Sequence, residues 1–172
     1  MRRVSLNART AIDATASEEV EVVLVKISHD ELEEPILLSS DPTERLSIEP
    51  LAYGTRSTWN GSAGSPFWFV LMSTLLPDDQ EDQPQAATLA LEVVDHDMAK
   101  LLRSTTKRAT VDVAVVLASS PDLVEAEWLG LELITAEGDS AEIKLSISRD
   151  PITAEPYPAR RMTRNVMPGL HR

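Results

Sequence analysis

The stretch Thr110–Leu117, TVDVAVVL, decides the fold class of this chain. Its odd-numbered positions are apolar throughout, whereas Thr110, Asp112 and Ala114 have the opposite parity. Because successive side chains of a strand point to opposite faces, this alternation predicts a β-strand with one buried face. The same alternation recurs in three further segments, Leu89–Val93, Leu129–Leu133 and Ile143–Ile147.

Three other segments indicate how these strands connect and pack. The cluster Glu137-Gly138-Asp139-Ser140 is typical of a turn, so we expect it to close a hairpin between the strands on either side. Residues 119–122, SSPD, predict a second tight turn. The segment Val20–Ile27 is apolar at both parities, which predicts a strand that is covered on both faces or passes through the centre of the fold.

Helical patterns are scarce. One candidate begins at Asp95, a favourable N-cap, and places Met98, Leu101 and Leu102 on one apolar stripe. A weaker candidate spans Ser5–Ala16 and is capped by its first residue. We therefore expect a mainly β fold, either an antiparallel β-sandwich or a partly open barrel, with one or two short flanking helices.

The chain of 172 residues is long enough for one domain with its own core. We expect this domain to span residues 1–150 and to include an N-terminal helix or arm. Residues 151–172 contain four prolines and four arginines without lasting periodicity. Since proline disfavours helix and removes backbone donors, this composition predicts an extended C-terminal arm.

The composition excludes several kinds of protein. Cysteine is absent, which excludes disulfides, thiolate metal sites and cysteine nucleophiles. The longest apolar stretch, Phe67–Leu76, is too short to span a bilayer, which takes about 20 residues. No apolar run follows the charged N-terminus, so we expect a soluble protein with no secretory signal.

The net charge of −12 is unevenly distributed. Residues 1–16 carry +2 and residues 151–172 carry +3, which leaves −17 on the body of the chain. Such a body repels nucleic acid. The charge is compatible with solubility alone. It is also compatible with a surface past which DNA moves, while the basic ends bind an acidic neighbour.

The residues that could carry chemistry favour no enzyme. His29, His96 and His171 are far apart and have no typical partner motif. Residues 95–97, DHD, fit helix capping better than a metal site, because adjacent helical side chains point about 100° apart. The acids of 78–82 lack the glycine and spacing of a calcium loop. No nucleophile elbow, phosphate loop or zinc motif occurs, so we expect no catalysis, metal or cofactor.

Two neighbouring segments carry most of the aromatic side chains. Trp59–Pro66, WNGSAGSP, is rich in turn residues and predicts an exposed loop or hairpin tip. The next three residues, Phe67-Trp68-Phe69, predict a strand that contributes to the core. An alternative role for Trp68 is an anchor in a protein–protein contact.

Three segments together resemble one known family. Residues 76–84, LPDDQEDQP, form an acidic loop before an alternating strand, and residues 109–122, ATVDVAVVLASSPD, form a strand with a V-x-L-A-S-x-P-D turn. Residues 155–170 begin with EPYPARRMT and end with MPGL. In combination these motifs resemble the phage minor tail protein family that is catalogued as a domain of unknown function, over nearly the whole chain.

The resemblance implies a structural virion protein of the tail tip of long-tailed phages, made in the host cytoplasm, with a tail-tube type of fold. It implies a ring-forming distal tail or baseplate hub subunit that joins the tail tube to the tip complex and lines the DNA channel. The implied partners are further copies of the chain, as a hexamer or alternatively a trimer, the tail tube protein, the tail-tip hub proteins and the C-terminus of the tape-measure protein. DNA passes without specific binding, and no membrane is involved.

Two sets of residues would serve this role. The acidic loop would face the lumen or an adjacent ring, through Asp78, Asp79, Glu81 and Asp82. The C-terminal arm would dock onto a neighbouring subunit, where Arg–carboxylate pairs fix the register, through Tyr157, Arg160, Arg161, Arg164, Pro168, Gly169 and Leu170.

Two alternatives belong to other classes of protein. A carbohydrate-binding β-sandwich adhesin at the tail tip would use Trp59 or Trp68 in an exposed groove. A small cell-wall hydrolase would need a carboxylate or His96 in a cleft.

Overall fold

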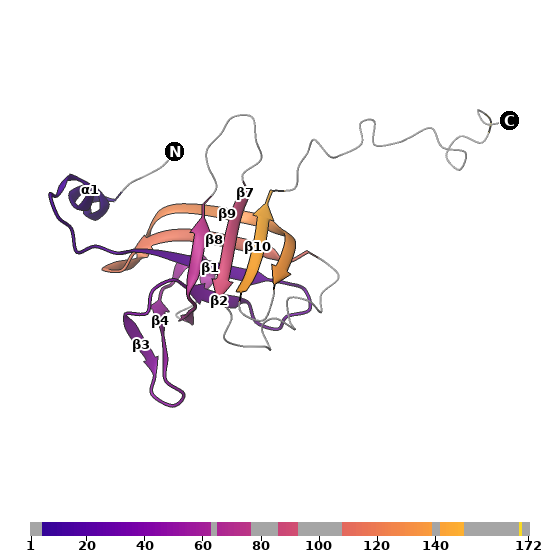
Figure 1. Ribbon diagram of the computed structural model, residues 1–172, viewed down its shortest axis with the longest axis horizontal. Helices are drawn as coiled ribbons and strands as arrows, with labels where there is room; N and C mark the ends of the chain where they lie inside the picture. The colour runs from indigo at the N-terminus through magenta and orange to yellow at the C-terminus, as the bar shows by residue number, and fades with distance from the viewer. Residues whose placement is uncertain are drawn as a thin grey trace.

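The computed structural model describes residues 5–62, 65–76, 86–92, 108–138, 142–149 and 169. Over these residues ten strands form a single sheet beside one α-helix, so the expected mainly β fold class is confirmed (Figure 1). The elements are α1 (Leu6–Asp13), β1 (Glu21–Ser28), β2 (Ile36–Ser39), β3 (Glu44–Ser47), β4 (Ala52–Arg56), the 3₁₀ turn η1 (Trp59–Gly61), β5 (Pro66–Phe69), β6 (Met72–Leu75), β7 (Ala86–Glu92), β8 (Thr110–Leu117), β9 (Ser120–Gly138) and β10 (Glu142–Ser148).

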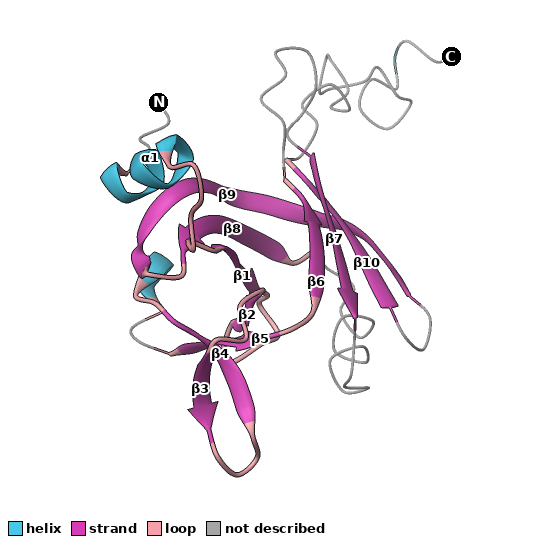
Figure 2. Ribbon diagram, turned by 60° about the vertical axis from the view of Figure 1, so that its left-hand side comes forward, coloured by secondary structure: helices cyan, strands magenta, loops and turns pink. Residues whose placement is uncertain are grey.

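The sheet curls back on itself through one bent segment. Its order is β3-β4-β5-β2-β1-β8-β9-β10-β7-β6, and only β2 and β5 pair in parallel. β5 and β6 are separated by two residues, Val70 and Leu71. The Val70 N–H donates to Ser39 O at the end of β2 (3.0 Å), whereas Leu71 O accepts from Glu92 N at the end of β7 (2.9 Å). The segment 66–75 therefore links the two sides of the sheet, and the result is a partly open barrel (Figure 2).

The inward-facing side chains fill this barrel. Strand β7 buries Leu89 and Leu91, and β10 buries Ile143, Leu145 and Ile147, as their alternation predicts. They pack with side chains from the strands opposite, Val25, Ile27, Leu38, Val111, Val113 and Leu131. Trp128 of β9 lies partly buried against the same core. The hairpin between β9 and β10 is confirmed, with Gly138 paired to Ile143, and so is the turn between β8 and β9.

A second core lies on the outer face of β1 and β8. It contains Val22 and Leu24 of β1, Ala114 and Val116 of β8, and, from other elements, Leu37, Trp59 and Phe67. Strand β1 is thus buried on both faces, as its apolar residues at both parities predict. The expectation of a single buried face for β8 is wrong, because the second core covers Ala114 and Val116 as well.

Trp59 covers the second core, so the expectation that Trp59–Pro66 forms an exposed loop or hairpin tip is wrong at Trp59. The side chain of Trp59 is only 7% exposed, and its ring lies 6.1 Å from that of Phe67. Asn60 and Gly61 adopt left-handed backbone angles (φ 50° and 70°), which turn the chain tightly over the sheet. The tight turn expected from Asn60 and Gly61 is therefore confirmed, but the turn folds over the sheet and does not project into solvent at Trp59. Phe67 belongs to the core, as expected.

One of the two expected helices lies within the described residues. Ser5 caps α1, and its hydroxyl accepts a hydrogen bond from Ala8 N at 3.1 Å. The helix ends at Asp13, three residues before the expected end. The candidate helix beginning at Asp95 lies outside the described residues.

The β3–β4 hairpin projects from the barrel (Figures 1 and 2). Gly54 of β4 faces Trp68 of β5 and leaves no room for a side chain. A Cβ at this position would lie 1.9 Å from the carbonyl oxygen of Phe67 and 2.8 Å from Leu46 Cδ1. Only glycine allows the hairpin to approach β5 this closely.

Candidate interaction surfaces

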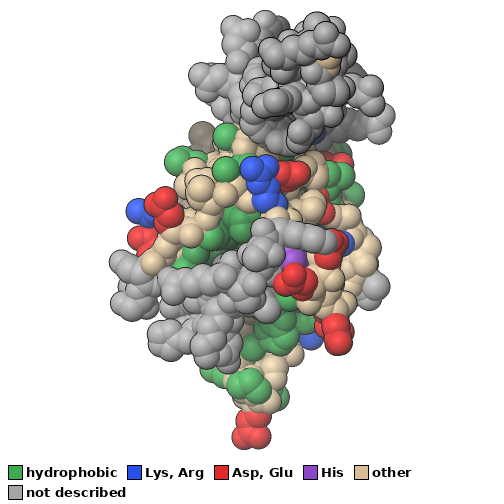
Figure 3. All heavy atoms as spheres, turned by 90° about the vertical axis from the view of Figure 1, so that its right-hand side faces the viewer, with side chains coloured by type: hydrophobic (Ala, Val, Ile, Leu, Met, Phe, Trp, Pro, Cys, Tyr) green, Lys and Arg blue, Asp and Glu red, His purple; other side chains and the backbone are tan. Residues whose placement is uncertain are grey.

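The tip of the β3–β4 hairpin carries exposed apolar side chains. Ile48 is 70% exposed and Leu51 is 61% exposed, on either side of Glu49 and Pro50, and Tyr53 is exposed further along β4. We call Ile48, Leu51 and Tyr53 the hairpin patch. Figure 3 shows hydrophobic side chains along the hairpin at the foot of the molecule. Because the hairpin extends away from the body, these side chains form an exposed apolar surface and do not reach the protein's own core.

The hairpin is electrically neutral in an otherwise acidic chain. Residues 44–56 contain Glu44, Arg45, Glu49 and Arg56, whereas the whole chain carries −12. Arg56 forms an ion pair with Glu44 across the two strands at the base of the hairpin. The pair is exposed and contributes little stability, but it helps to orient the hairpin. Neutrality permits a close approach by a second acidic protein.

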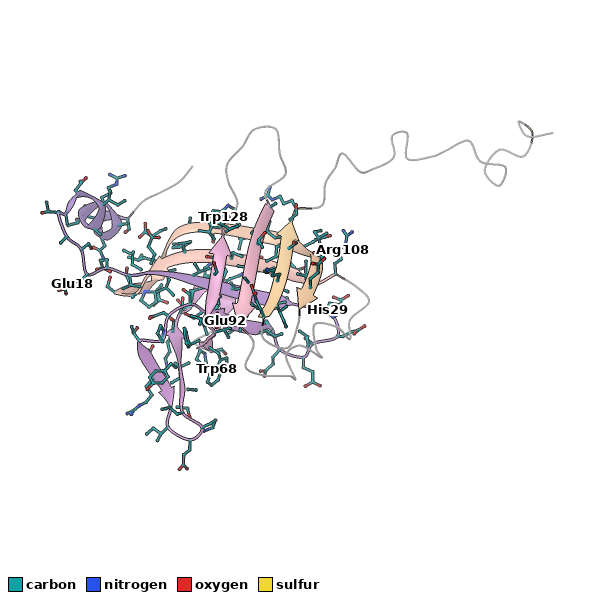
Figure 4. The ribbon with its side chains drawn as sticks, in the orientation of Figure 1. Glu18, His29, Trp68, Glu92, Arg108 and Trp128 are labelled. Atoms are coloured by element: carbon teal, nitrogen blue, oxygen red, sulfur yellow. The ribbon has the colours of Figure 1, made fainter. Side chains whose placement is uncertain are left out.

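Trp68 extends the apolar surface to the base of the hairpin (Figure 4). It is paired with Gly54 on one side and Leu38 on the other, and it is 45% exposed. A large, half-exposed aromatic side chain on a rigid strand suits a contact with another protein. Trp59, by contrast, is buried and its indole N–H donates to Glu127 Oε2 (3.3 Å), so Trp59 lines no exposed groove.

Helix α1 forms a second projecting surface (Figure 1). Leu6 and Ile12 are exposed, and Ala8 alone among the residues of α1 is buried. The Ser5 N–H donates to Glu125 Oε2 on β9 at 2.8 Å, which ties the start of the helix to the barrel. The helix therefore exposes two large apolar side chains, Leu6 and Ile12.

A polar network fixes the segment that covers the second core. Asp112 of β8 accepts hydrogen bonds at both carboxylate oxygens, from Gly130 N (2.7 Å) and from Asn60 Nδ2 (2.6 Å). The Lys26 ammonium donates to Asn60 O at 2.7 Å. We call Lys26, Asn60, Asp112 and Gly130 the Asp112 network. It joins β1, β8, β9 and η1, and its groups satisfy one another, so its role is structural.

Asp122 fixes the other end of the same segment. The pKa of Asp122 is lowered, chiefly because the Thr58 N–H donates to its carboxylate (2.7 Å) and then because the Thr58 hydroxyl donates as well (2.9 Å). Desolvation opposes this shift, and a smaller contribution from Ser57 reinforces it.

This lowered pKa predicts a pH-dependent contribution to stability. A carboxyl whose pKa is lower in the folded state stabilises the protein above its unfolded pKa, near 3.8, and loses that effect as the pH falls through the folded value. We expect Asp122→Asn to unfold at a lower denaturant concentration than the natural protein at pH 7, and the gap to narrow progressively as the pH falls below about 4. Denaturation midpoints between pH 3 and pH 7 measure this. A gap that stays constant with pH would contradict it.

Most of the site residues expected from the sequence lie outside the described residues. These are the acidic loop residues Asp78, Asp79, Glu81 and Asp82 and the arm residues Tyr157, Arg160, Arg161, Arg164, Pro168 and Leu170. Gly169 is described; it is exposed, and a Cβ at this position would meet no atom within 4 Å. The domain boundary at 150 also lies at a residue outside the described ranges.

The hairpin patch was missed at the sequence level. One signal was available: Ile48 and Leu51 flank the dipeptide Glu49-Pro50, so apolar residues occupy positions where a turn is expected. In a turn such residues have no core to enter. Alternation does not reveal them, because strands β3 and β4 are only four and five residues long.

The described residues contain few groups suited to chemistry. Among them, no group of three or more His, Asp or Glu side chains is placed to hold a metal ion, and no helix is long and apolar enough to cross a membrane. His29 accepts a hydrogen bond at Nδ1 from Glu31 N (3.1 Å), and it lies at the end of β1 (Figure 4). His96 and His171 lie outside the described residues.

A scan against protein-family models finds no match to this chain, and a search of curated proteins finds none either.

Proposed function

We propose that this chain is a structural subunit of the distal tail of a long-tailed phage. In this role it forms a ring that joins the tail tube to the tip complex. The observation that carries the proposal is the hairpin patch: apolar side chains exposed at the tip of an element that projects from the barrel. The choice of a phage tail as the assembly comes from the sequence motifs, which resemble those of phage minor tail proteins.

Ring formation requires two different surfaces on each subunit. A heterologous contact, in which one surface of a subunit meets another surface of the next, closes into a ring when the rotation is right. The hairpin patch and helix α1 are two such surfaces, and they project from different sides of the barrel (Figure 1). Each is neutral: residues 44–56 contain two acids and two bases, and α1 contains Arg9 and Asp13. Neutral contacts suit subunits that otherwise repel one another.

The charge of the remaining chain suits a channel for DNA. With +2 and +3 at the two ends, the body carries −17. A negative lining repels the DNA backbone, so DNA passes without binding. The partners under this proposal are further copies of the chain, as a hexamer or a trimer, together with the tail tube, hub and tape-measure proteins. The location is the virion.

The hairpin patch provides the test of this proposal. We expect the double variant Ile48→Ser, Leu51→Ser to lose ring formation, since a contact made by two large apolar side chains contributes several kcal/mol, about 1.5–3 per side chain. Light scattering would give the mass of the protein alone and mixed with the neighbouring tail proteins. The natural protein should form a ring-sized species in at least one of these conditions.

Leu123→Ser is the matched control, because Leu123 is also exposed (52%) but lies on β9 and not on the hairpin. This variant should assemble normally. If the natural protein stays monomeric with every tail protein, the proposed function is wrong. If the hairpin variant assembles as well as the control, the hairpin patch is not the contact.

A further inference from the structure

The two edges of the sheet differ in how they are protected against pairing with another chain. β3 carries Glu44 and Arg45 and is interrupted by a bulge beside Arg45, and both features hinder strand addition. β6, at the other edge, has the sequence Met-Ser-Thr-Leu with no charge and no proline. On its outward side, Leu71 is 56% exposed and Leu75 is 71% exposed. An apolar, uncharged edge of this kind is a site for strand pairing.

The register of β6 shows which backbone groups face this edge. Leu71 O accepts from Glu92 N, so Leu71 and Glu92 form a hydrogen-bonded pair. Because hydrogen-bonded and non-hydrogen-bonded pairs alternate, Ser73 and Leu75 also bond to β7. The N–H and C=O groups of Met72 and Thr74 point the other way. The described part of the chain gives them no hydrogen-bond partner.

We propose that β6 pairs with β6 of a second copy of this chain, antiparallel about a two-fold axis at Ser73. In this register Met72 of one copy exchanges hydrogen bonds with Thr74 of the other, which uses the backbone groups of both copies that point away from β7. Leu71 then lies opposite the partner's Leu75, so the exposed apolar residues cover one another. In this register the inward-facing side chains of both copies lie on one face of the joined sheet and the outward-facing side chains lie on the other, as strand pairing requires.

Two features favour a second copy over another protein. The segment 71–75, LMSTL, has apolar residues at both ends and Ser73 at its centre, so it is complementary to itself under a two-fold rotation. It also contains no charge in a chain of net charge −12. Two like-charged copies can therefore approach here without facing carboxylates across the strand. This pairing does not depend on the proposed function, since it needs neither the hairpin patch nor any tail protein.

Cysteine crosslinking tests the register directly, because the natural chain contains no cysteine. A central non-hydrogen-bonded pair at Ser73 would bring the two Cα atoms to about 4.5 Å, which permits a disulfide. We expect Ser73→Cys to form a covalent dimer under mild oxidation. We also expect Leu71→Cys mixed with Leu75→Cys to crosslink more than either variant alone. Leu123→Cys, which is also exposed but lies on β9 and not on β6, is the control.

A second variant measures the strand pairing without a crosslink. Thr74→Pro removes an N–H that faces the free edge and leaves the bonds from Ser73 and Leu75 to β7 in place. Two hydrogen bonds are lost per dimer, so the dissociation constant measured by light scattering or ultracentrifugation should rise about tenfold or more. Equal crosslinking of Ser73→Cys and Leu123→Cys would overturn the proposal. So would a Thr74→Pro variant that dimerises like the natural protein.

Discussion

The variant Trp59→Ala is expected to lower the free energy of unfolding by about 3–5 kcal/mol, the range for removing a buried large aromatic side chain. Trp59 is 7% exposed, packs against Phe67 and covers Val22, Leu24 and Val116 in the second core. Its removal leaves a cavity on the outer face of the two strands at the centre of the sheet. Urea denaturation with an unchanged m-value would measure the loss.

The variant Trp59→Phe separates packing from hydrogen bonding. It keeps an aromatic ring against Phe67 but loses the indole N–H that donates to Glu127. We expect it to cost well under half as much as Trp59→Ala, since the Glu127 side chain is exposed and can bond to water. A Trp59→Ala protein of nearly natural stability would contradict the burial of Trp59. It would also support the alternative in which Trp59 lies in an exposed groove that binds carbohydrate.

The variant Asp112→Ala is expected to be the next most damaging, with a loss of about 2–4 kcal/mol. Asp112 accepts two short hydrogen bonds, from Gly130 N and Asn60 Nδ2, and hydrogen bonds to a charged group contribute about 1.5–3 kcal/mol each. Gly130 has a left-handed backbone (φ 67°) at the bulge in β9, where its N–H leaves the strand ladder and bonds to this carboxylate. Thermal and urea unfolding would both show the change.

Two controls accompany Asp112→Ala. Asp112→Asn retains one carbonyl oxygen and should recover part of the stability, because one of the two donors keeps an acceptor. Thr110→Ala, at an exposed position of the same parity on β8, should change the unfolding free energy by less than about 0.5 kcal/mol. If Asp112→Ala behaved like Thr110→Ala, the Asp112 network would not hold η1 to the sheet.

Helix α1 and the central strands could be predicted because their signals are local. Ser5 is a favourable cap, and the structure shows its hydroxyl accepting from Ala8 N. Strand β10 alternates Ile143, Leu145 and Ile147 with polar residues because one of its faces lies against the barrel core. Strand β1 is apolar at both parities, and together with β8 it separates the two cores.

The burial of Trp59 and the exposure of the hairpin patch could not be predicted in this way. Asn60 and Gly61 indicate a tight turn, but a turn can equally project into solvent or fold over a sheet. The outcome depends on contacts distant in sequence, such as the bond from Asn60 to Asp112 and that from Thr58 to Asp122. Gly54 likewise shows no signal until β5 is placed against it.

The sequence by itself determined the mainly β class, the buried parity of β7 and β10, the hairpin connections on both sides of β9 and the N-terminal helix, whereas the expected parity failed at Ala114 and Val116 of β8 and at Leu129 of β9, which is 44% exposed. Each depends on residues within one or two turns or one strand of each other, so the pattern is complete in the local sequence. Only the tertiary structure decided that segment 66–75 closes the sheet, that Trp59 is inside, and that the hairpin patch and β6 are exposed. These depend on which strands become neighbours, and that is set by packing between residues far apart in the chain.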